Sequence, residues 1–232
     1  MKIKMYADGA NLTEISKMNS DAQVSGFTTN PTLMRRAGIT DYLGFAQAVV
    51  DIVSPKPISL EVFSDTIDEM ERQALRLQSI GPNVYVKIPV TNTKGESTAQ
   101  LVKNLSSSGV QLNVTAIFTT KQVEQVVEAL SNGAPSVVSV FAGRIADAGI
   151  DPVPLMTGYA EEISRHAGME LLWASPREIL NLVQANDSGC QIITMTPDLF
   201  GKIKNLGKPL DEFSLETVQM FYDDATSSGF KL

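Results

Sequence analysis

Residues 83–90, NVYVKIPV, place a single charged side chain, Lys87, in a run of β-branched and aromatic residues. A run that is apolar on both of its alternating faces is typical of a strand in a parallel sheet that helices cover on both sides. Lysine is seldom buried without a partner, and burial favours the neutral amine, which is a nucleophile. Two interpretations are open: Lys87 is a reactive buried amine, or it lies at a strand end and extends its ammonium into water.

Seven more segments of this kind alternate with helical segments along the chain. In one helical segment, Ile67, Met70, Ala74 and Leu77 recur at spacings of 3, 4 and 3, which place them on one face. The eight predicted strands cover residues 3–6, 24–27, 58–63, 84–88, 111–114, 136–140, 170–173 and 191–194. Strands that alternate with helices in this way predict right-handed βαβ units and a parallel sheet.

Eight βα units in 232 residues favour a closed (β/α)8 TIM barrel. A doubly wound sheet would more often carry a Gly-x-Gly-x-x-Gly turn after a strand, and the sequence has none. We expect a single α/β barrel domain over residues 1–232, in which residues 213–232 form an appended C-terminal helical segment. Within it, SLETVQMFYDDA, residues 214–225, carries an apolar stripe that would close the barrel or dock on a neighbouring subunit.

The composition, 43% hydrophobic and 19% charged, is typical of a soluble globular protein. No apolar stretch approaches the roughly 18 residues that span a bilayer, and the first residues, MKIKMYADGANL, lack the apolar core of a secretory signal. The single cysteine, Cys190, cannot form an internal disulfide, so we expect a cytoplasmic protein. A net charge of -7 argues against nucleic acid or an anionic membrane as the main partner.

The only histidine, His166, argues against enzymes that need histidine in their site, such as zinc aldolases and Ser/His/Asp hydrolases. It stands two residues before Gly168, a typical residue after a helix end. We expect His166 at the C-terminal end of a helix, where the helix dipole favours a cation.

Polar residues end or follow each predicted strand. The carboxyl ends of barrel strands form one face, and in barrel enzymes that face carries the active site. We therefore expect these side chains to meet around one site: Asp8, Asn30, Glu61, Lys87, Asn113 with Thr115, Arg144, Ser175 with Arg177, and Thr196.

Two of these residues also have a structural interpretation as helix caps. Asn30 precedes a proline and is typical of an N-cap. Ser175 also precedes a proline, and Glu178 follows three residues later, which is the pattern of a capping box. A helix that begins there would offer an anion its free N–H groups, the Ser175 hydroxyl and the Arg177 guanidinium. Together with Arg144, this terminus could clamp a phosphate.

Asp8 and Glu61 are the candidate acid–base carboxylates. Strand alternation places Glu61 on the same side as Ser59 and Phe63. The alternative for Glu61 is a buried ion pair with Lys87 that performs no chemistry. An amine, two carboxylates, amides and an anion clamp at one barrel mouth predict Schiff-base chemistry on a phosphorylated carbonyl compound.

Eight motifs, taken in order, resemble the transaldolase family in its short bacterial form, which includes the fructose-6-phosphate aldolases. The motifs are YADGANL, GFTTNPTLM, SLEVF, VYVKIPVT, LNVTAIFTT, SVFAGRI, LLWASPREIL and IITMTPDL, and they cover nearly the whole chain. TTNP followed at a distance by VKIP is the most specific pair. The resemblance implies that Lys87 forms the Schiff base and that Asp8 handles the proton of the substrate hydroxyl. It also implies that Glu61 and Thr115 hold a water used for proton transfer.

The resemblance further implies how the sugar is bound. Asn30 and Asn113 match asparagines that bind the hydroxyls of the dihydroxyacetone fragment, and Thr29 belongs to the same motif. The phosphate-binding positions are matched by Arg144, Ser175 and Arg177. No metal or organic cofactor is implied, and the family's ring-like oligomers imply a homo-oligomer that uses the C-terminal helix.

Two positions favour transfer over cleavage. Where the aldolases of this family carry glutamine and tyrosine, this chain has Glu61 and Phe141, the transaldolase types. The implied activity is reversible transfer of a dihydroxyacetone unit from fructose 6-phosphate or sedoheptulose 7-phosphate to an aldose phosphate. The loop AGRIADAGIDPVP is fuller than in many short members, which leaves the sugar open. The alternatives are an aldolase or transaldolase for a sulfonated or surface-polysaccharide sugar, and a non-catalytic phosphosugar-binding barrel in which Lys87 only pairs with Glu61.

Overall fold

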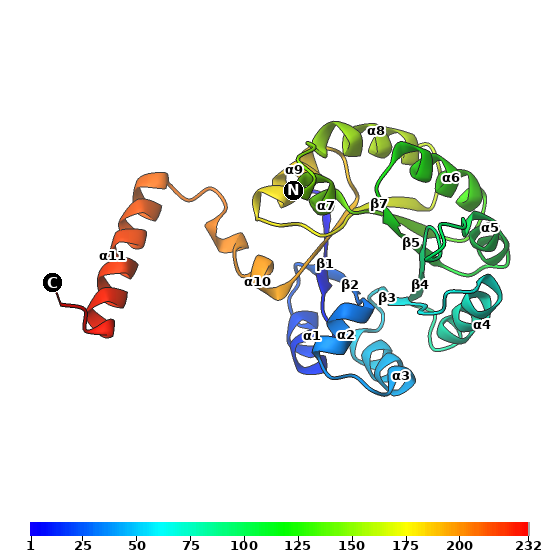
Figure 1. The fold of residues 1–232 in the computed structure, drawn as a ribbon, viewed down its shortest axis with the longest axis horizontal. Coiled ribbons are helices and arrows are strands. Elements are labelled where there is room, and N and C mark those ends of the chain that lie inside the picture. Colours follow the sequence, from blue (N-terminus) through cyan, green and yellow to red (C-terminus); the bar gives the residue numbers. More distant parts are fainter. Residues whose placement is uncertain (232) are drawn as a thin grey trace. The chain divides into compact units, whose positions relative to one another are not determined.

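The computed structural model describes residues 1–231, and its main feature is a closed barrel of eight parallel strands (Figure 1). The strands follow one another around the barrel in sequence order, and the last pairs with the first. Their bounds are β1 (Lys4–Asp8), β2 (Val24–Thr28), β3 (Ile58–Glu61), β4 (Val84–Pro89), β5 (Leu112–Ile117), β6 (Ser136–Val140), β7 (Met169–Trp173) and β8 (Ile192–Met195). The predicted (β/α)8 barrel is confirmed, and each predicted strand overlaps an observed one.

Helices surround the barrel, and several of them, such as α3, α4, α6 and α8, pack buried apolar residues toward the strands (Figure 1). On α4, Met70, Ala74 and Leu77 of the predicted stripe are buried. The helices of this layer are α1 (Leu12–Asn19), α2 (Pro31–Arg36), α3 (Tyr42–Val53), α4 (Ile67–Gln78), α5 (Ala99–Ser107), α6 (Thr120–Leu130), α7 (Ala142–Asp147), α8 (Val153–Ile163), α9 (Leu180–Asp187) and α10 (Pro197–Phe200).

His166 lies beyond the end of α8 rather than within its last turn. The helix ends at Ile163, and His166 occupies the following turn, 3.6 Å from the Glu162 carboxylate through Nε2. The expectation that a helix ends at His166 is therefore wrong, because α8 already ends at Ile163 and the chain turns from Ser164 onward.

The chain from Gly201 onward forms a compact unit separate from the barrel unit, Met1–Phe200. It contains the 3-10 turn η1 (Ile203–Asn205) and the long helix α11 (Leu210–Ser228), which includes the helix expected over residues 214–225. Helix α11 ends at Gly229, whose φ of 67° is the left-handed conformation that glycine adopts at helix ends. No side chain of α11 is buried. Among the helices of residues 1–231, none combines the length and the apolar character needed to cross a bilayer.

Candidate active site

A cavity of about 540 Å³ opens at the carboxyl ends of the strands, and every strand contributes to its wall. The strand residues that line it include Asp8, Thr28, Glu61, Lys87, Thr115, Ser139, Leu172 and Thr194. Loop and helix residues complete it, among them Asn30, Arg36, Phe141, Arg144, Ser175 and Arg177. The polar residues expected to meet at one face therefore line this cavity, apart from Asn113 and Thr196.

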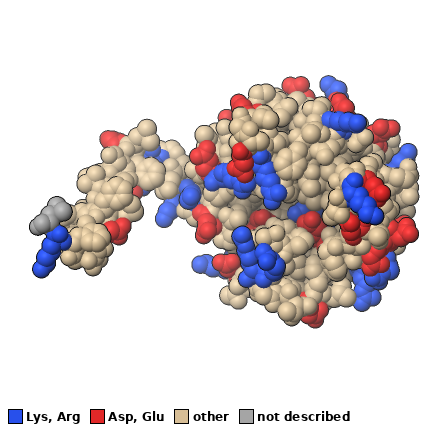
Figure 2. Space-filling model, in the orientation of Figure 1, with Lys and Arg blue, Asp and Glu red and all other residues tan. Residues whose placement is uncertain are grey.

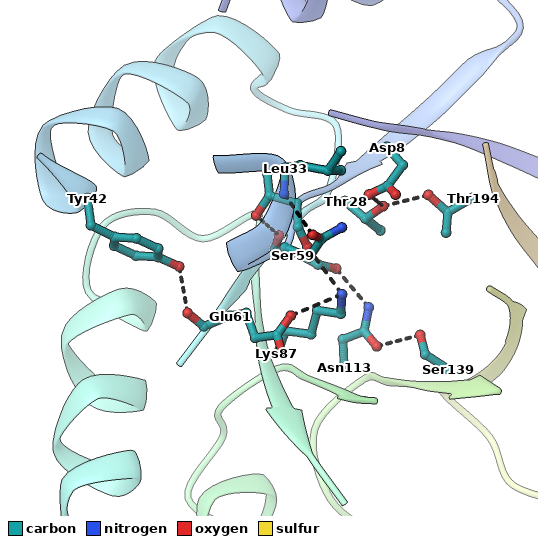
Figure 3. A network of polar contacts seen from close by, with 12 residues as sticks. Asp8, Thr28, Leu33, Tyr42, Ser59, Glu61, Lys87, Asn113, Ser139 and Thr194 are labelled. Carbon is teal, nitrogen blue, oxygen red and sulfur yellow. Dashed lines mark hydrogen bonds and ion pairs between the residues drawn. The ribbon is translucent and has the colours of Figure 1, made fainter. Parts of the chain in front are cut away.

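Lys87 is buried at this cavity, with 9% of its side chain exposed. Its Nζ lies 3.2 Å from Glu61 Oε2 (Figure 3). The same nitrogen donates a hydrogen bond of 3.2 Å to the carbonyl oxygen of Thr29. The ion pair follows from strand register, since Glu61 on β3 lies beside Lys87 on β4. The interpretation in which Lys87 extends into water is wrong, because its side chain is buried and its amine contacts Glu61 and Thr29.

Asp8 lines the same cavity as Lys87, at the end of β1. Thr28 Oγ1 donates a 2.8 Å hydrogen bond to Asp8 Oδ1 and lies 2.5 Å from Thr194 Oγ1 (Figure 3). Burial raises the pKa of Asp8 above its ordinary value, and the nearby Glu61 carboxylate adds to this. The Lys87 ammonium and the Thr28 hydrogen bond act in the opposite direction. Asp8 is thus a stronger base than an exposed aspartate.

An irregularity in β5 aims two consecutive residues into the cavity. The register of β5 with β6 shifts between Val114 and Ile117, and Ala116 has a φ of 60°. Neighbouring residues of a regular strand face opposite sides, whereas Thr115 and Ala116 both line the cavity. Thr115 Oγ1 is buried and has no hydrogen-bond partner among residues 1–231. The hydrogen-bonding capacity of this hydroxyl is therefore unused within the described residues.

Asn113 is held beneath the cavity by two serines. Its Nδ2 donates to Ser59 Oγ at 2.9 Å, and its Oδ1 accepts from Ser139 Oγ at 2.7 Å (Figure 3). Asn113 is fully buried and is not part of the wall, but Ser139 is. The amide therefore links β3, β5 and β6 below the floor.

The two threonines of the TTNP motif face opposite ways, as alternation along an extended segment requires. Thr29 is buried, its hydroxyl donates to Ser59 O at 3.0 Å, and it reaches the site only through the carbonyl that accepts from Lys87. Thr28 lines the cavity instead. Asn30 caps α2, because its side chain accepts from Leu33 N at 3.0 Å, and it also lines the cavity.

The candidate anion clamp is formed where two loops approach closely. The backbone N–H of Gly143 donates to Ala174 O at 3.2 Å, and a Cβ at position 143 would lie 1.6 Å from Ser175 O. Only glycine permits this approach, which brings Arg144 and Ser175 to the same cavity. Ser175 has a φ of 58°, an uncommon conformation that recurs at functional sites.

The capping box predicted at Ser175 is wrong. Helix α9 begins at Leu180, and the backbone N–H groups of Arg177 and Glu178 donate to Asn181 Oδ1 at 2.7 and 3.2 Å. Asn181 satisfies the groups that Ser175 was expected to cap, so Arg177 stands in a loop and not in the first turn of a helix.

The two arginines of the clamp differ in their partners. Arg177 forms an ion pair with Asp147, to which its Nε donates at 3.1 Å and its Nη2 donates as well. Arg177 holds the pKa of Asp147 below its ordinary value, and Arg144 adds to this effect. Arg144 has no carboxylate partner among residues 1–231, and its guanidinium lies 5.1 Å from the centre of the Phe141 ring. Arg144 therefore offers the cavity the less neutralised charge.

Phe63 lies outside the cavity, which corrects the alternation expected beyond Glu61. Strand β3 ends at Glu61, and Phe63 is 65% exposed with its ring 5.4 Å from that of Tyr42. The Tyr42 hydroxyl donates to the carbonyl oxygen of Glu61 at 2.7 Å (Figure 3). This hydrogen bond fixes the end of β3 and so the direction of the Glu61 side chain.

The cavity also holds residues that the sequence did not single out, notably Thr28, Arg36, Ser139 and Thr194. Three of them are hydroxyl residues at inward positions of apolar strands, which is the only signal that could have marked them. Thr196, which the sequence did single out, lies at the start of α10, where its carbonyl oxygen accepts hydrogen bonds from the backbone N–H groups of Leu199 and Phe200. Figure 2 shows acidic and basic side chains interspersed on the drawn face of the barrel, so charge alone does not mark the site.

Comparison with known proteins gives a consistent result. The profile of a family described as "Transaldolase/Fructose-6-phosphate aldolase" matches residues 5–232. A protein of Dehalococcoides mccartyi named "Probable transaldolase" is 34% identical over 195 residues, which are 83% of this chain and 86% of the relative. A protein of the same name from a Thermoanaerobacter species is 31% identical over 231 residues, 99% of this chain and 100% of the relative.

Solved structures share the fold. The crystal structure of 2,3-dimethylmalate lyase superposes with a TM-score of 0.58 and covers 99% of this chain and 84% of the lyase, at 13% identity. At this identity the similarity concerns the barrel alone.

Proposed function

Because the chain belongs to the transaldolase/fructose-6-phosphate aldolase family, we propose that it is a transaldolase acting through a Schiff base on Lys87. It transfers a dihydroxyacetone unit from a ketose phosphate, fructose 6-phosphate or sedoheptulose 7-phosphate, to an aldose phosphate. The observation that carries this proposal is the buried Lys87 amine, 3.2 Å from Glu61, in a cavity that every strand lines.

The first stage is imine formation. Lys87 passes its ammonium proton to the Glu61 carboxylate 3.2 Å away, and the resulting neutral amine adds to the C2 carbonyl of the ketose. The carbinolamine then loses its oxygen as water and leaves a protonated imine. Glu61 and Thr115 hold the water that carries protons during this exchange. The ion pair between Glu61 and Lys87 supports this role, as does the buried Thr115 hydroxyl with no hydrogen-bond partner among residues 1–231.

The second stage is cleavage of the C3–C4 bond. Asp8 accepts the proton of the C4 hydroxyl, the bond breaks, and its electron pair moves into the protonated imine to give a neutral enamine and a free aldehyde. An acceptor aldose phosphate is then attacked by the enamine carbon, and Asp8 returns its proton to the new hydroxyl. Water releases the product from Lys87. The raised pKa of Asp8 supports a role as proton acceptor and donor.

The remaining residues bind the sugar. We assign the dihydroxyacetone hydroxyls to Asn30, with Asn113 and Thr29 supporting the site from below through Ser59. The distal phosphate is assigned to Arg144, Ser175 and Arg177 on the close pair of loops. Phe141 lines the cavity without a hydroxyl group that could protonate the enamine, which favours transfer over cleavage.

Borohydride reduction in the presence of fructose 6-phosphate tests the Schiff base. We expect a reduced three-carbon adduct on Lys87, located by mass spectrometry, and none in Lys87→Ala. Lys87→Arg is the matched control, because it keeps a cation beside Glu61 but no primary amine. A failure to trap any adduct would favour the phosphosugar-binding barrel, and an adduct that survives in Lys87→Ala would refute Lys87 as the Schiff-base residue.

The same assay separates transfer from cleavage. With erythrose 4-phosphate present, sugar product should form far faster than free dihydroxyacetone forms without it. Equal rates would instead identify an aldolase. A panel of phosphorylated and sulfonated donors then defines the sugar.

We also propose that the protein is a homo-oligomer that associates through α11. The support is an unburied helix with large apolar side chains at Leu215, Val218, Phe221 and Tyr222, each at least 60% exposed. Apolar surface of this extent on one helix is typical of an interaction site.

A further inference from the structure

We infer that Thr194, on β8, is a positioning residue for Asp8 and acts through Thr28 in a chain of two hydroxyl groups. The inference deepens the proposed function, since it takes Asp8 as the proton acceptor. Its basis is the contact of 2.5 Å between the hydroxyls of Thr194 and Thr28, and that of 2.8 Å between Thr28 and Asp8 (Figure 3).

The direction of the hydrogen bonds follows from the number of hydrogens. A hydroxyl has one hydrogen, and an ionised carboxylate can only accept. Thr28 therefore gives its hydrogen to Asp8, and the oxygen of Thr28 accepts from Thr194. When Asp8 is protonated, each hydroxyl can rotate, so that Asp8 donates to Thr28 and Thr28 donates to Thr194. The chain thus satisfies both protonation states that the reaction requires.

The barrel topology makes this chain possible. Strand β1 lies between β2 and β8, and Asp8 stands beside Thr28 in the register of β1 with β2. Thr194 on β8 stands beside Tyr6 of β1. Tyr6 precedes Asp8 by two residues, so it occupies the next position below Asp8 on the inward face of β1. Thr28 and Thr194, from the two flanking strands, therefore meet beneath the carboxylate.

Burial makes each hydrogen bond in the chain matter. Thr28 is 2% exposed and Thr194 is 7% exposed, and the other β8 residues, Ile192, Ile193 and Met195, are buried and apolar. A buried hydroxyl that loses its donor is costly, and a polarised chain strengthens each of its members. Without Thr194, the Thr28 oxygen loses its donor, and its hydrogen bond to the Asp8 carboxylate weakens.

These contacts determine the direction in which loss of the Thr194 hydroxyl shifts the pKa of Asp8. The charged groups that act on Asp8 are Lys87 from β4, which lowers its pKa, and Glu61 from β3, which raises it. Thr28 also lowers the pKa of Asp8, because it donates to the ionised form. Loss of Thr194 weakens that donation, so the pKa of Asp8 rises and the acid limb of the rate profile moves to higher pH.

The test compares Thr194→Val, which keeps the shape and removes the hydroxyl, with Thr194→Ser, which keeps the hydroxyl. For Thr194→Val we expect kcat with fructose 6-phosphate to fall about tenfold, KM to change less than about twofold, and the acid limb to move to higher pH. Thr194→Ser should restore most of kcat and the original limb. Thr196→Val is the matched control, because it removes a hydroxyl from the same strand end outside the cavity.

A second readout does not depend on catalysis. Titration of the labelled Asp8 carboxyl by carbon NMR should give a higher pKa in Thr194→Val than in the wild type, with Thr194→Ser near the wild type. An unchanged pKa in a folded Thr194→Val variant overturns the inference. If borohydride traps no imine in the wild type, the proposed function fails, but this titration still decides the role of Thr194.

Discussion

Arg144 and Arg177 line the same cavity, but only one of them is neutralised by a carboxylate. Asp147 accepts from two nitrogens of Arg177, whereas Arg144 makes no ion pair among residues 1–231 and stacks on Phe141. A phosphate would therefore find more unshielded charge, and more free N–H donors, on Arg144. The two residues are not equivalent halves of a clamp.

This difference predicts a ranking of two variants. Arg144→Ala should raise KM for fructose 6-phosphate by about one to two orders of magnitude, and Arg177→Ala by less, because charged hydrogen bonds of this kind are worth about 1.5–3 kcal/mol. With unphosphorylated dihydroxyacetone donors, both variants should resemble the wild type. Steady-state kinetics with the two donor classes provides the measurement.

The control for this ranking is Arg165→Ala, which removes an exposed arginine paired with Glu162 on α8. Equal losses for phosphorylated and unphosphorylated donors would refute the clamp. A larger loss for Arg177→Ala than for Arg144→Ala would refute the argument from Asp147.

Single residues were predictable from the sequence where their chemistry conflicts with their surroundings. Lys87 and Glu61 stand out as charges in apolar strands, and the structure pairs them. Thr28 and Thr194 were missed because a threonine fits a strand well and leaves no conflict in the pattern. Their importance depends on a contact of 2.5 Å between strands far apart in the sequence.

At the scale of elements, Gly143 controls how α7 meets the loop after β7. A Cβ at this position would lie 1.6 Å from Ser175 O and 2.6 Å from Ser175 C, which are backbone atoms. Side-chain rotation cannot relieve such a contact, so one of the two loops must move. Because Arg144 and Ser175 belong to these loops, the phosphate end of the cavity would open.

Gly143→Ala should therefore lower stability by about 1–3 kcal/mol and raise KM for phosphorylated donors several-fold. Gly158→Ala is the matched control, because a Cβ there meets nothing within 4 Å on α8. Alanine inside a helix stabilises by about 0.5–1 kcal/mol relative to glycine. Thermal denaturation measures the stability of both variants. A Gly143→Ala protein as stable as the wild type would contradict the predicted clash with Ser175.

Element boundaries show why sequence patterns failed locally. The capping box at Ser175 has the right residue types, but Asn181 supplies the acceptor and the helix starts at Leu180. Alternation predicted an inward Phe63, but β3 ends at Glu61 and the chain turns outward. Both patterns use only residues that are neighbours in the sequence. The outcome depended on the hydrogen bonds to Asn181 in the first case and on the end of β3 at Glu61 in the second.

At the scale of the whole molecule, the fold was predictable because it rests on repetition. Eight apolar strands alternating with helices leave few other ways to bury every strand on both faces. The cavity follows from the same topology, since parallel strands end on one face. The contacts within it depend on side-chain geometry, which the pattern does not contain.

Helix α11 exposes several large apolar side chains. It carries Val218 at 60% and Phe221 at 63% exposure, and full burial of such side chains is worth about 1.5–3 kcal/mol each. If α11 docks on a neighbouring subunit, Val218→Ser with Phe221→Ser should raise the dissociation constant of the oligomer at least about a hundredfold. Light scattering after size exclusion should then give a smaller mass for the double variant than for the wild type.

The same measurement separates the two roles expected for this helix. Gln219→Ser, a polar substitution on α11, controls for effects on the helix itself and should leave the mass unchanged. If α11 instead closes the barrel of its own chain, the double variant should melt at a lower temperature while its mass equals that of the wild type. A wild-type protein that stays monomeric at every concentration measured would contradict subunit docking.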